Sequence, residues 1–351
     1  DKAYFLGSLG IVLKKEGKFC FYNKQGLKII PLEYDSISRL GDHLKVMQNG
    51  KLGVFDKEGN KLLPIKYSEI LIHNSAGMFV VRDRKDNLNL INEKGRKLAS
   101  DLKTVSIYVD GAVIGNGEKY GIVTNHVNTK FIYDSVPVGT YEKSTPKTRS
   151  YRRTSRHRGL IPTTGGRMKK IIVVNDGKAG MVDSANNIII PLENNEVIRM
   201  KYKNYFTVKK GKKYGYFLNK CNKYQSPIYD GLYMDGTSYL RVYLAGKSGM
   251  VDDATGKLIL PIEYNGIYKT SDSFTLTKNR KKGVADRNGK LMLPIIYDKI
   301  ENLSSYFSSE YKGFYKVTIG KQSGIVTSQN KIVIPIKFEY IGEFEEYFFL
   351  A

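Results

Sequence analysis

Histidine and cysteine are the side chains best suited to metal binding and nucleophilic chemistry, and both are rare in this sequence. The histidines are His43, His73, His126 and His157. No two of them have the His-x-x-x-His spacing that places a zinc-protease pair on one face of a helix. We therefore expect the histidines to lie on loops in contact with solvent. The two cysteines, Cys20 and Cys221, are too few for a Cys-based zinc site, and we expect unpaired thiols.

Acidic and glycine-containing motifs do not form a catalytic set either. Aspartates recur where a predicted strand enters a turn, at Asp56, Asp183, Asp252 and Asp286. A carboxylate at such a position accepts hydrogen bonds from the backbone of its own turn. Gly246-Lys247-Ser248 resembles the end of a phosphate-binding loop, but Arg241 occupies the position of the upstream glycine. We predict no enzyme activity, no metal, no cofactor and no small-molecule substrate.

Positive charge is the most pronounced chemical property of the chain. It has 57 Lys and Arg against 34 Asp and Glu, a formal net charge of +23. Residues 139–170 contain ten of the basic residues and a single acidic one, Glu142. Guanidinium groups pair with carboxylates or phosphates in bidentate fashion. The candidate partner-binding residues in this segment are Arg149, Arg152, Arg153, Arg156, Arg158, Arg167, Lys169 and Lys170.

Three interpretations of segment 139–170 stay open: a docking arm for an anionic or protein partner, a solvated spacer, and a processing site. Outside the segment, 47 basic and 33 acidic residues remain, so the excess of positive charge extends over the whole chain. A global positive charge favours polyanions without sequence specificity.

The elements that position these residues follow an internal repeat. The stretch 50–70 returns at 246–267 and at 282–300, each time with a glycine turn, then Leu-Pro, then Tyr three residues after the proline. Weaker copies bring the total to about nine repeats of about 33–36 residues each. Segment 139–170 interrupts this single array, which otherwise covers residues 1–351.

Each repeat is predicted to contain three short strands joined by tight turns, with almost no helix. In the copy that follows residue 50, the strands are expected at 53–56, 61–64 and 78–82, and Pro64 is expected to end the second strand. The recurring Tyr, and the Ile three residues after it, should fill the core between neighbouring repeats. The predicted fold is all-β: meander repeats that form either a propeller-like ring or an open curved solenoid.

The pattern resembles the WG-repeat family, a group of bacterial β-repeat proteins. Its motif is Trp-Gly, two hydrophobic residues and Asp, then a Gly turn, then hydrophobic-Pro-x-x-Tyr-Asp-x-Ile. Gly-x-x-Asp is present at 53–56, 180–183, 249–252 and 283–286, and Tyr-Asp at 34–35, 133–134, 229–230 and 297–298. The chain has no Trp; the namesake positions hold Phe19, Leu52, Leu88, Tyr120, Ala179, Tyr214, Ser248, Lys282 and Ser323. Cys20 and Asn89 also replace the motif glycine.

The resemblance implies a repeat scaffold without catalytic residues, and a place among exported or surface proteins. We expect a non-enzymatic scaffold that binds protein partners, such as a membrane-protein complex, in a bacterial envelope assembly. The expected location is the periplasm or cell surface, with the cytoplasm as the alternative. Two other functions stay open: a polyanion-binding module that uses the basic surface and residues 141–170, and a carbohydrate-binding or hydrolytic β-propeller.

Overall fold

The computed structural model describes residues 2–124, 128–129, 131–137, 142–143, 166–167, 169–200, 205–236, 238–303, 312–344 and 347–350. Every element named in these residues is a β-strand, which confirms the all-β prediction. The strands pair antiparallel, and nine of the sheets have three or four strands, in agreement with about nine predicted repeats. None of the described residues forms a helix long and apolar enough to cross a membrane.

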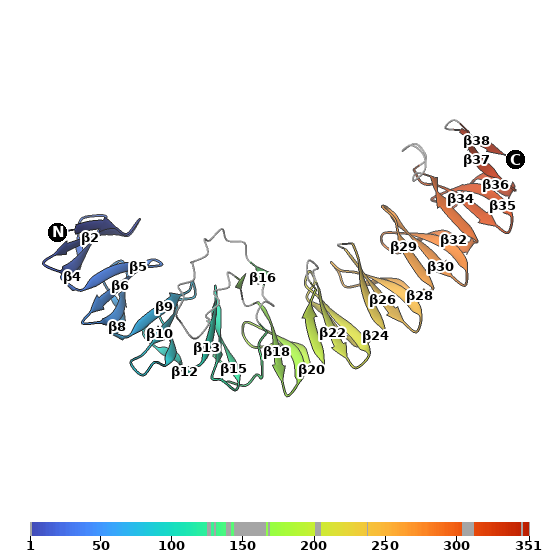
Figure 1. Ribbon diagram of the computed structural model, residues 1–351. Coiled ribbons are helices and arrows are strands. Elements are labelled where there is room, and N and C mark those ends of the chain that lie inside the picture. Colours follow the sequence, from blue (N-terminus) through green and yellow to red (C-terminus); the bar gives the residue numbers. More distant parts are fainter. Residues whose placement is uncertain are drawn as a thin grey trace. The chain divides into compact units, whose positions relative to one another are not determined.

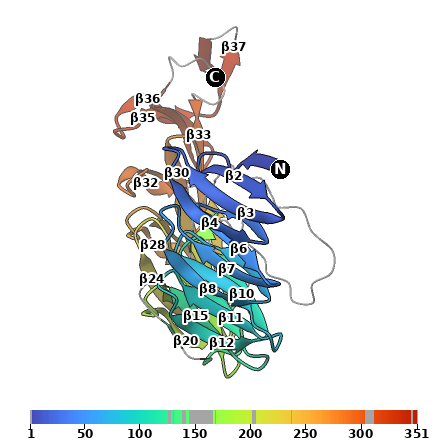
Figure 2. The same ribbon diagram turned by 90° about the vertical axis from the view of Figure 1, so that its left-hand side faces the viewer.

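The chain divides into two compact units, Asp1–Asn194 and Asn195–Ala351. Within the first unit the sheets follow one another in chain order (Figure 1, Figure 2). Their strands are β1 (Lys2–Phe5), β2 (Gly10–Lys15), β3 (Lys18–Asn23) and β4 (Lys28–Tyr34); β5 (Ser36–Leu40), β6 (His43–Gln48), β7 (Lys51–Phe55) and β8 (Lys61–Tyr67); β9 (Glu69–His73), β10 (Met78–Arg82), β11 (Leu88–Asn92) and β12 (Lys97–Leu102); β13 (Thr104–Tyr108), β14 (Gly111–Gly115) and β15 (Tyr120–Thr124); β16 (Glu142–Lys143) and β17 (Gly166–Arg167); and β18 (Lys170–Asn175), β19 (Lys178–Asp183) and β20 (Ile188–Asn194).

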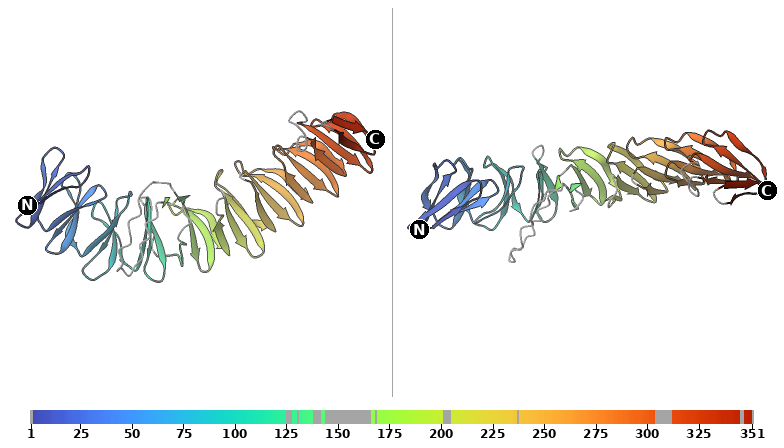
Figure 3. Two further views of the ribbon diagram at one scale, coloured as in Figure 1. Left: turned by 45° about the horizontal axis from the view of Figure 1, so that its top comes forward. Right: turned by 90° about the horizontal axis from the view of Figure 1, so that it is seen from above.

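The second unit has the same organisation, with its sheets again in chain order (Figure 3). Its strands are β21 (Glu196–Arg199), β22 (Tyr205–Lys210), β23 (Lys213–Leu218) and β24 (Lys223–Tyr229); β25 (Gly231–Asp235), β26 (Tyr239–Leu244), β27 (Lys247–Asp252) and β28 (Leu258–Tyr264); β29 (Gly266–Lys269), β30 (Ser273–Lys278), β31 (Lys281–Asp286) and β32 (Leu291–Tyr297); β33 (Lys299–Asn302), β34 (Phe314–Ile319), β35 (Gln322–Thr327) and β36 (Ile332–Phe338); and β37 (Ile341–Phe344) and β38 (Tyr347–Leu350).

The prediction of three strands per repeat is wrong, because most sheets have four. The segment after each repeated Tyr forms the first strand of the next sheet; β9, for example, begins two residues after Tyr67. Pro64 does not end its strand either, since β8 continues to Tyr67. Leu52 pairs with Tyr67 whereas Val54 pairs with Leu63, so β8 has extra residues between these pairs. Such a bulge on the edge strand of a sheet tolerates a proline, which has no N–H to donate.

This bulge explains the glycine of the repeat motif. A Cβ atom on Gly53 would lie 2.9 Å from the carbonyl oxygen of Leu63 and 3.1 Å from the Cα of Ile65. The backbone of the bulged strand therefore occupies the space that a side chain would need. The same close approach occurs at Gly180, Gly215, Gly249, Gly283 and Gly324. The residue before this glycine, where the family has Trp, lies opposite the repeated Tyr, as in the pair Leu52 and Tyr67.

The repeated tyrosines are buried, as predicted for a core between repeats. The described examples are Tyr34, Tyr67, Tyr133, Tyr229, Tyr264 and Tyr297. Tyr67 packs in one cluster with Leu63 of its own sheet and with Ile70 and Phe79 of the next sheet. Since each cluster takes residues from two sheets, a sheet cannot bury its face alone and the stack supplies the stability.

Candidate interaction surface

The candidate arm lies mostly outside the described residues, and Arg149, Arg152, Arg153, Arg156 and Arg158 all fall there. Two short strands of the segment are described: Glu142 pairs with Arg167 and Lys143 with Gly166. Lys169 is exposed. Lys170 is the first residue of β18 and pairs with Asp183, so the next sheet already begins within the predicted segment.

A second group of basic residues gathers at the hairpin turns between the second and third strands of the sheets. In the second unit these turns join β22 to β23, β26 to β27, β30 to β31 and β34 to β35. We define the hairpin cations as Lys212, Lys247, Arg280, Lys282 and Lys321, which lie in or next to the four turns. None of these five has a carboxylate partner among the described residues. Each of the four repeats therefore presents positive charge at an equivalent place.

Backbone geometry makes these turns tight. Ala245 and Gly246 both have positive φ, 51° and 72°, and so do Asn279 and Arg280, 51° and 63°. Two successive residues of this kind form the turn whose twist matches that of the adjoining strands. The Gly246-Lys247-Ser248 stretch, compared above with a phosphate-binding loop, is part of such a hairpin and opens no helix.

The residue that joins one sheet to the next holds each hairpin in place. Asp230 lies between β24 and β25; it accepts a hydrogen bond from the backbone N–H of Ala245 at 2.7 Å and forms an ion pair with Lys213 at 2.6 Å. Lys213 belongs to the hairpin of one sheet and Ala245 to the hairpin of the following sheet. Asp230 therefore ties two successive basic hairpins together. We call a residue in this role a linker residue.

The same arrangement recurs at Asp298. Its carboxylate accepts a hydrogen bond from the backbone N–H of Gly320 at 2.8 Å and forms an ion pair with Lys281 at 2.5 Å. The lysine and then the backbone N–H hold the pKa of the Asp298 carboxyl below its usual range, and the pKa of Asp230 is lowered for the same reasons. Asparagine performs the backbone part of this role at Asn195 and Asn265. The Tyr-Asp pair is visible in the sequence as a motif, but its role in joining successive hairpins is visible only in the structure.

The aspartates predicted to cap turns do so. Asp56 Oδ1 accepts hydrogen bonds from the backbone N–H groups of Glu58 and Asn60, at 3.0 and 2.7 Å. Asp183, Asp252 and Asp286 accept equivalent bonds in their own turns. These carboxylates stabilise hairpins and are separated along the stack.

Exposed apolar side chains form a row in the second unit. Ile198, Tyr233 and Tyr268 hold the same position in β21, β25 and β29, the first strands of three successive sheets. They are 45%, 58% and 72% exposed. Arg241, opposite Tyr233 on β26, has its guanidinium carbon 5.9 Å from the centre of that ring and also pairs with Asp235. We call Ile198, Tyr233 and Tyr268 the apolar row; no sequence motif marks it.

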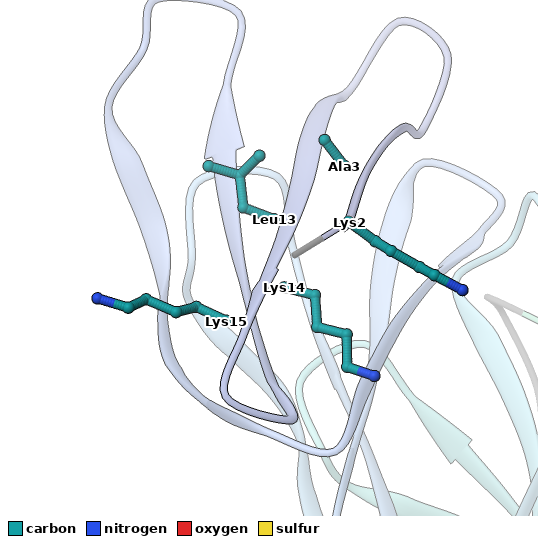
Figure 4. A pocket seen from close by; sticks show the side chains of 5 residues that line it. All are labelled: Lys2, Ala3, Leu13, Lys14 and Lys15. Carbon is teal, nitrogen blue, oxygen red and sulfur yellow. The ribbon is translucent and has the colours of Figure 1, made fainter.

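A shallow hollow near the N-terminus has a volume of about 340 Å³ and is lined by Lys2, Ala3, Leu13, Lys14 and Lys15. Figure 4 shows that Lys15 extends to the opposite side from Lys2 and Lys14. The three ammonium groups do not converge on one point, so this hollow lacks the geometry of an anion-binding site.

Two histidines contradict the prediction that all of them lie on solvated loops. The side chains of His43 and His73 are only 15% and 14% exposed, and the Nε2 atoms of both face Oε1 of Glu93. Burial lowers the pKa of His73, and it outweighs the hydrogen bond to Glu93, which acts in the opposite direction. Helical spacing does not pair these two histidines, because they come from neighbouring sheets. His126 and His157 lie outside the described residues.

Comparison with known proteins identifies the repeat. A family model described as "WG containing repeat" matches residues 180–214, 283–305 and 324–346. No curated protein sequence matches the chain.

Three solved structures resemble the chain weakly. A eukaryotic initiation factor is 11% identical, with 97% of each chain covered and a TM-score of 0.28. BamB from Moraxella catarrhalis is 9% identical, with 94% of this chain and 97% of that chain covered and a TM-score of 0.21. Hsv2 from Kluyveromyces lactis is 9% identical, with 80% and 91% covered and a TM-score of 0.23. Similarity this low carries no argument about function.

Proposed function

Because three segments of this chain match the WG-repeat model, we propose that the protein is a non-enzymatic scaffold that binds an acidic protein partner. The apolar row carries this proposal. Its three residues hold the same position in three successive sheets. Their exposed side chains do not contribute to the core. Exposed apolar groups that gather on one surface mark interaction sites, and Tyr and Arg are enriched in protein interfaces.

The chemistry of the partner follows from charge. With a net charge of +23 the chain attracts acidic proteins and repels basic ones. Full burial of a large apolar side chain contributes about 1.5–3 kcal/mol, so three such anchors supply several kcal/mol before the costs of association. The proposed setting is a bacterial envelope assembly, which rests on where the family commonly occurs.

A comparative purification tests the proposal. The full chain carries an affinity tag in three forms: the parent, a row variant with Ile198→Ser, Tyr233→Ser and Tyr268→Ser, and a control variant with Leu258→Ser and Leu291→Ser. Leu258 and Leu291 are 48% and 47% exposed and also hold one position in successive sheets, as the first residues of β28 and β32 at the other sheet edge, so this control asks which of two exposed apolar rows binds the partner. The parent and the control should retain the same acidic protein, and the row variant should lose it. Equal recovery with all three forms would exclude the apolar row as the binding surface.

The hairpin cations favour a second candidate function, polyanion binding. They lie at one equivalent place in four successive repeats, and the linker residues fix the hairpins that carry them. A cation that neutralises a DNA phosphate releases bound counterions. The logarithm of the affinity for duplex DNA therefore falls linearly with the logarithm of the salt concentration, with a slope of about −0.9 per phosphate contact.

Salt dependence tests this second function with a short DNA duplex as the probe. Changing all five hairpin cations to Ser should reduce the steepness of the slope of log affinity against log salt concentration by several units. A control that changes Lys24, Lys57, Lys61, Lys94 and Lys97 to Ser removes the same charge from the first unit. If both variants flatten the slope equally, binding follows net charge and the hairpins have no special role.

A further inference from the structure

A cluster of two histidines and one glutamate connects two neighbouring sheets of the first unit. His43 begins β6, whereas His73 ends β9 and Glu93 lies in the turn after β11. Glu93 Oε1 is 3.3 Å from His43 Nε2 and 2.9 Å from His73 Nε2. One potential ligand atom from each residue lies within 4.8 Å of the others.

The surrounding residues hold the two imidazoles in place. The ring centres are 4.6 Å apart with an interplanar angle of 75°. Both rings lie against Phe79, which is fully buried, at centroid distances of 5.9 Å for His43 and 4.5 Å for His73. Packing of this kind fixes ligand direction before an ion binds, which reduces the cost of binding.

A glycine leaves room for the carboxylate of the cluster. A Cβ on Gly77 would lie 2.8 Å from Cδ of Glu93 and 2.9 Å from its Oε2, so a larger residue would displace the carboxylate. Glu93 is 44% exposed. The imidazole side chains, 15% and 14% exposed, are mostly shielded from water, whereas the carboxylate side chain lies at the solvent side of the cluster.

Two imidazole nitrogens and one carboxylate oxygen match the preferences of Zn²⁺, whereas Mg²⁺ and Ca²⁺ prefer oxygen ligands. Ligand atoms bound tetrahedrally to Zn²⁺ at about 2.0–2.1 Å lie about 3.3 Å from one another. The two nitrogen–oxygen distances in the cluster, 3.3 and 2.9 Å, are close to this value. All three ligand atoms lie within 4.8 Å of one another, so side-chain shifts that bring each pair to about 3.3 Å would complete the site, with water as the fourth ligand.

We propose that His43, His73 and Glu93 bind one Zn²⁺ ion. The ion joins the sheet of β5–β8 to the sheet of β9–β12, because His43 comes from the first and the other two ligands from the second. It stabilises the stack at this junction and is independent of the apolar row, which lies in the second unit.

Zinc titration of the full chain tests the site, after treatment with a chelator and with ZnCl₂ as the only added metal. A chromophoric competitor should report one bound ion per chain. Changing Glu93→Gln or His73→Asn should weaken binding at least about 10-fold, since loss of contacts outside the ligand set alone costs 10–100-fold. A control that combines His126→Asn with His157→Asn should bind as the parent does.

Thermal unfolding gives a second readout. Zn²⁺ should raise the melting temperature of the parent and of the control, because a ligand that binds only the folded state stabilises it. At the same zinc concentration it should raise the melting temperature of Glu93→Gln less, and this variant changes a half-exposed side chain without changing its shape. The proposal is overturned if the parent binds no stoichiometric zinc, or if Glu93→Gln and His73→Asn bind zinc like the parent. In that case the three side chains form a hydrogen-bonded cluster only.

Discussion

Replacing Gly283 with Ala tests why the repeat motif contains a glycine. A Cβ at this position would lie 2.9 Å from the carbonyl oxygen of Leu293 and 3.1 Å from the Cα of Ile295. Both contacts are to the backbone of the bulged strand β32, which cannot rotate away as a side chain does. Overpacking of this kind costs about 1–3 kcal/mol.

Gly266→Ala is the matched control. The atoms nearest to its added Cβ are those of Thr277, at 3.8 and 3.9 Å, an ordinary contact distance. Its φ is not positive, so the substitution should be neutral or stabilise by about 0.4–1 kcal/mol through the unfolded state. Both glycines belong to the same four-stranded sheet, β29–β32, so they report on the same local stability.

Thermal unfolding followed by circular dichroism measures the difference. One kcal/mol shifts the midpoint by about 2–4 °C in a unit of this size, so Gly283→Ala should lower the melting temperature by about 2–12 °C. Amide hydrogen exchange in β31 and β32 should accelerate in Gly283→Ala and not in Gly266→Ala. Equal midpoints for the two variants would refute the explanation of the motif glycine.

Three further predictions concern the core, the linker residues and the arm. Tyr297→Ala should destabilise the chain by about 3–5 kcal/mol in denaturant unfolding, because it removes a buried aromatic side chain, whereas the 72% exposed Tyr268 should tolerate Ala within about 0.5 kcal/mol. The lowered pKa of Asp298 means that its folded form binds fewer protons than its unfolded form; its stabilisation is therefore present above the ordinary pKa of about 3.9 and is lost as pH falls through the lowered value. Asp298→Asn should make the melting temperature less sensitive to acid over that range, and an unchanged pH profile would contradict this role. Changing the five arm arginines to Ser should abolish partner binding and leave the melting temperature unchanged if the segment is a docking arm; normal binding would show that it is a spacer. Those arginines are Arg149, Arg152, Arg153, Arg156 and Arg158.

The repeat, its number and its core were predictable because the same chemistry recurs at a fixed spacing. Tyr and Ile return in every strong copy, and the burial of Tyr67, Tyr264 and Tyr297 follows from periodicity alone. The boundary between sheets was not predictable in this way. A single residue such as Asp298 separates the last strand of one sheet from the first strand of the next, and neither of its neighbours is a glycine or proline that would mark the change.

The cluster of His43, His73 and Glu93 could not be predicted from the sequence for a different reason. His43 and His73 are 30 residues apart, close to one repeat length, and both flank the first hairpin turn of their sheets. Spacing rules for helices do not apply to stacked sheets, where residues about one repeat apart become neighbours. A search for metal-binding residues at repeat spacing would have paired these histidines, although Glu93 becomes visible only once the turn geometry is known.

Site-specific photo-crosslinking in living cells tests the central claim most directly, with a photoreactive residue placed singly at 198, 233 or 268, or at the control positions 258 and 291. The scaffold account predicts that the three positions of the apolar row give adducts with one and the same acidic protein, and that the two control positions do not. Adducts at the control positions as abundant as those at the row, or no protein adduct from any row position, would contradict it.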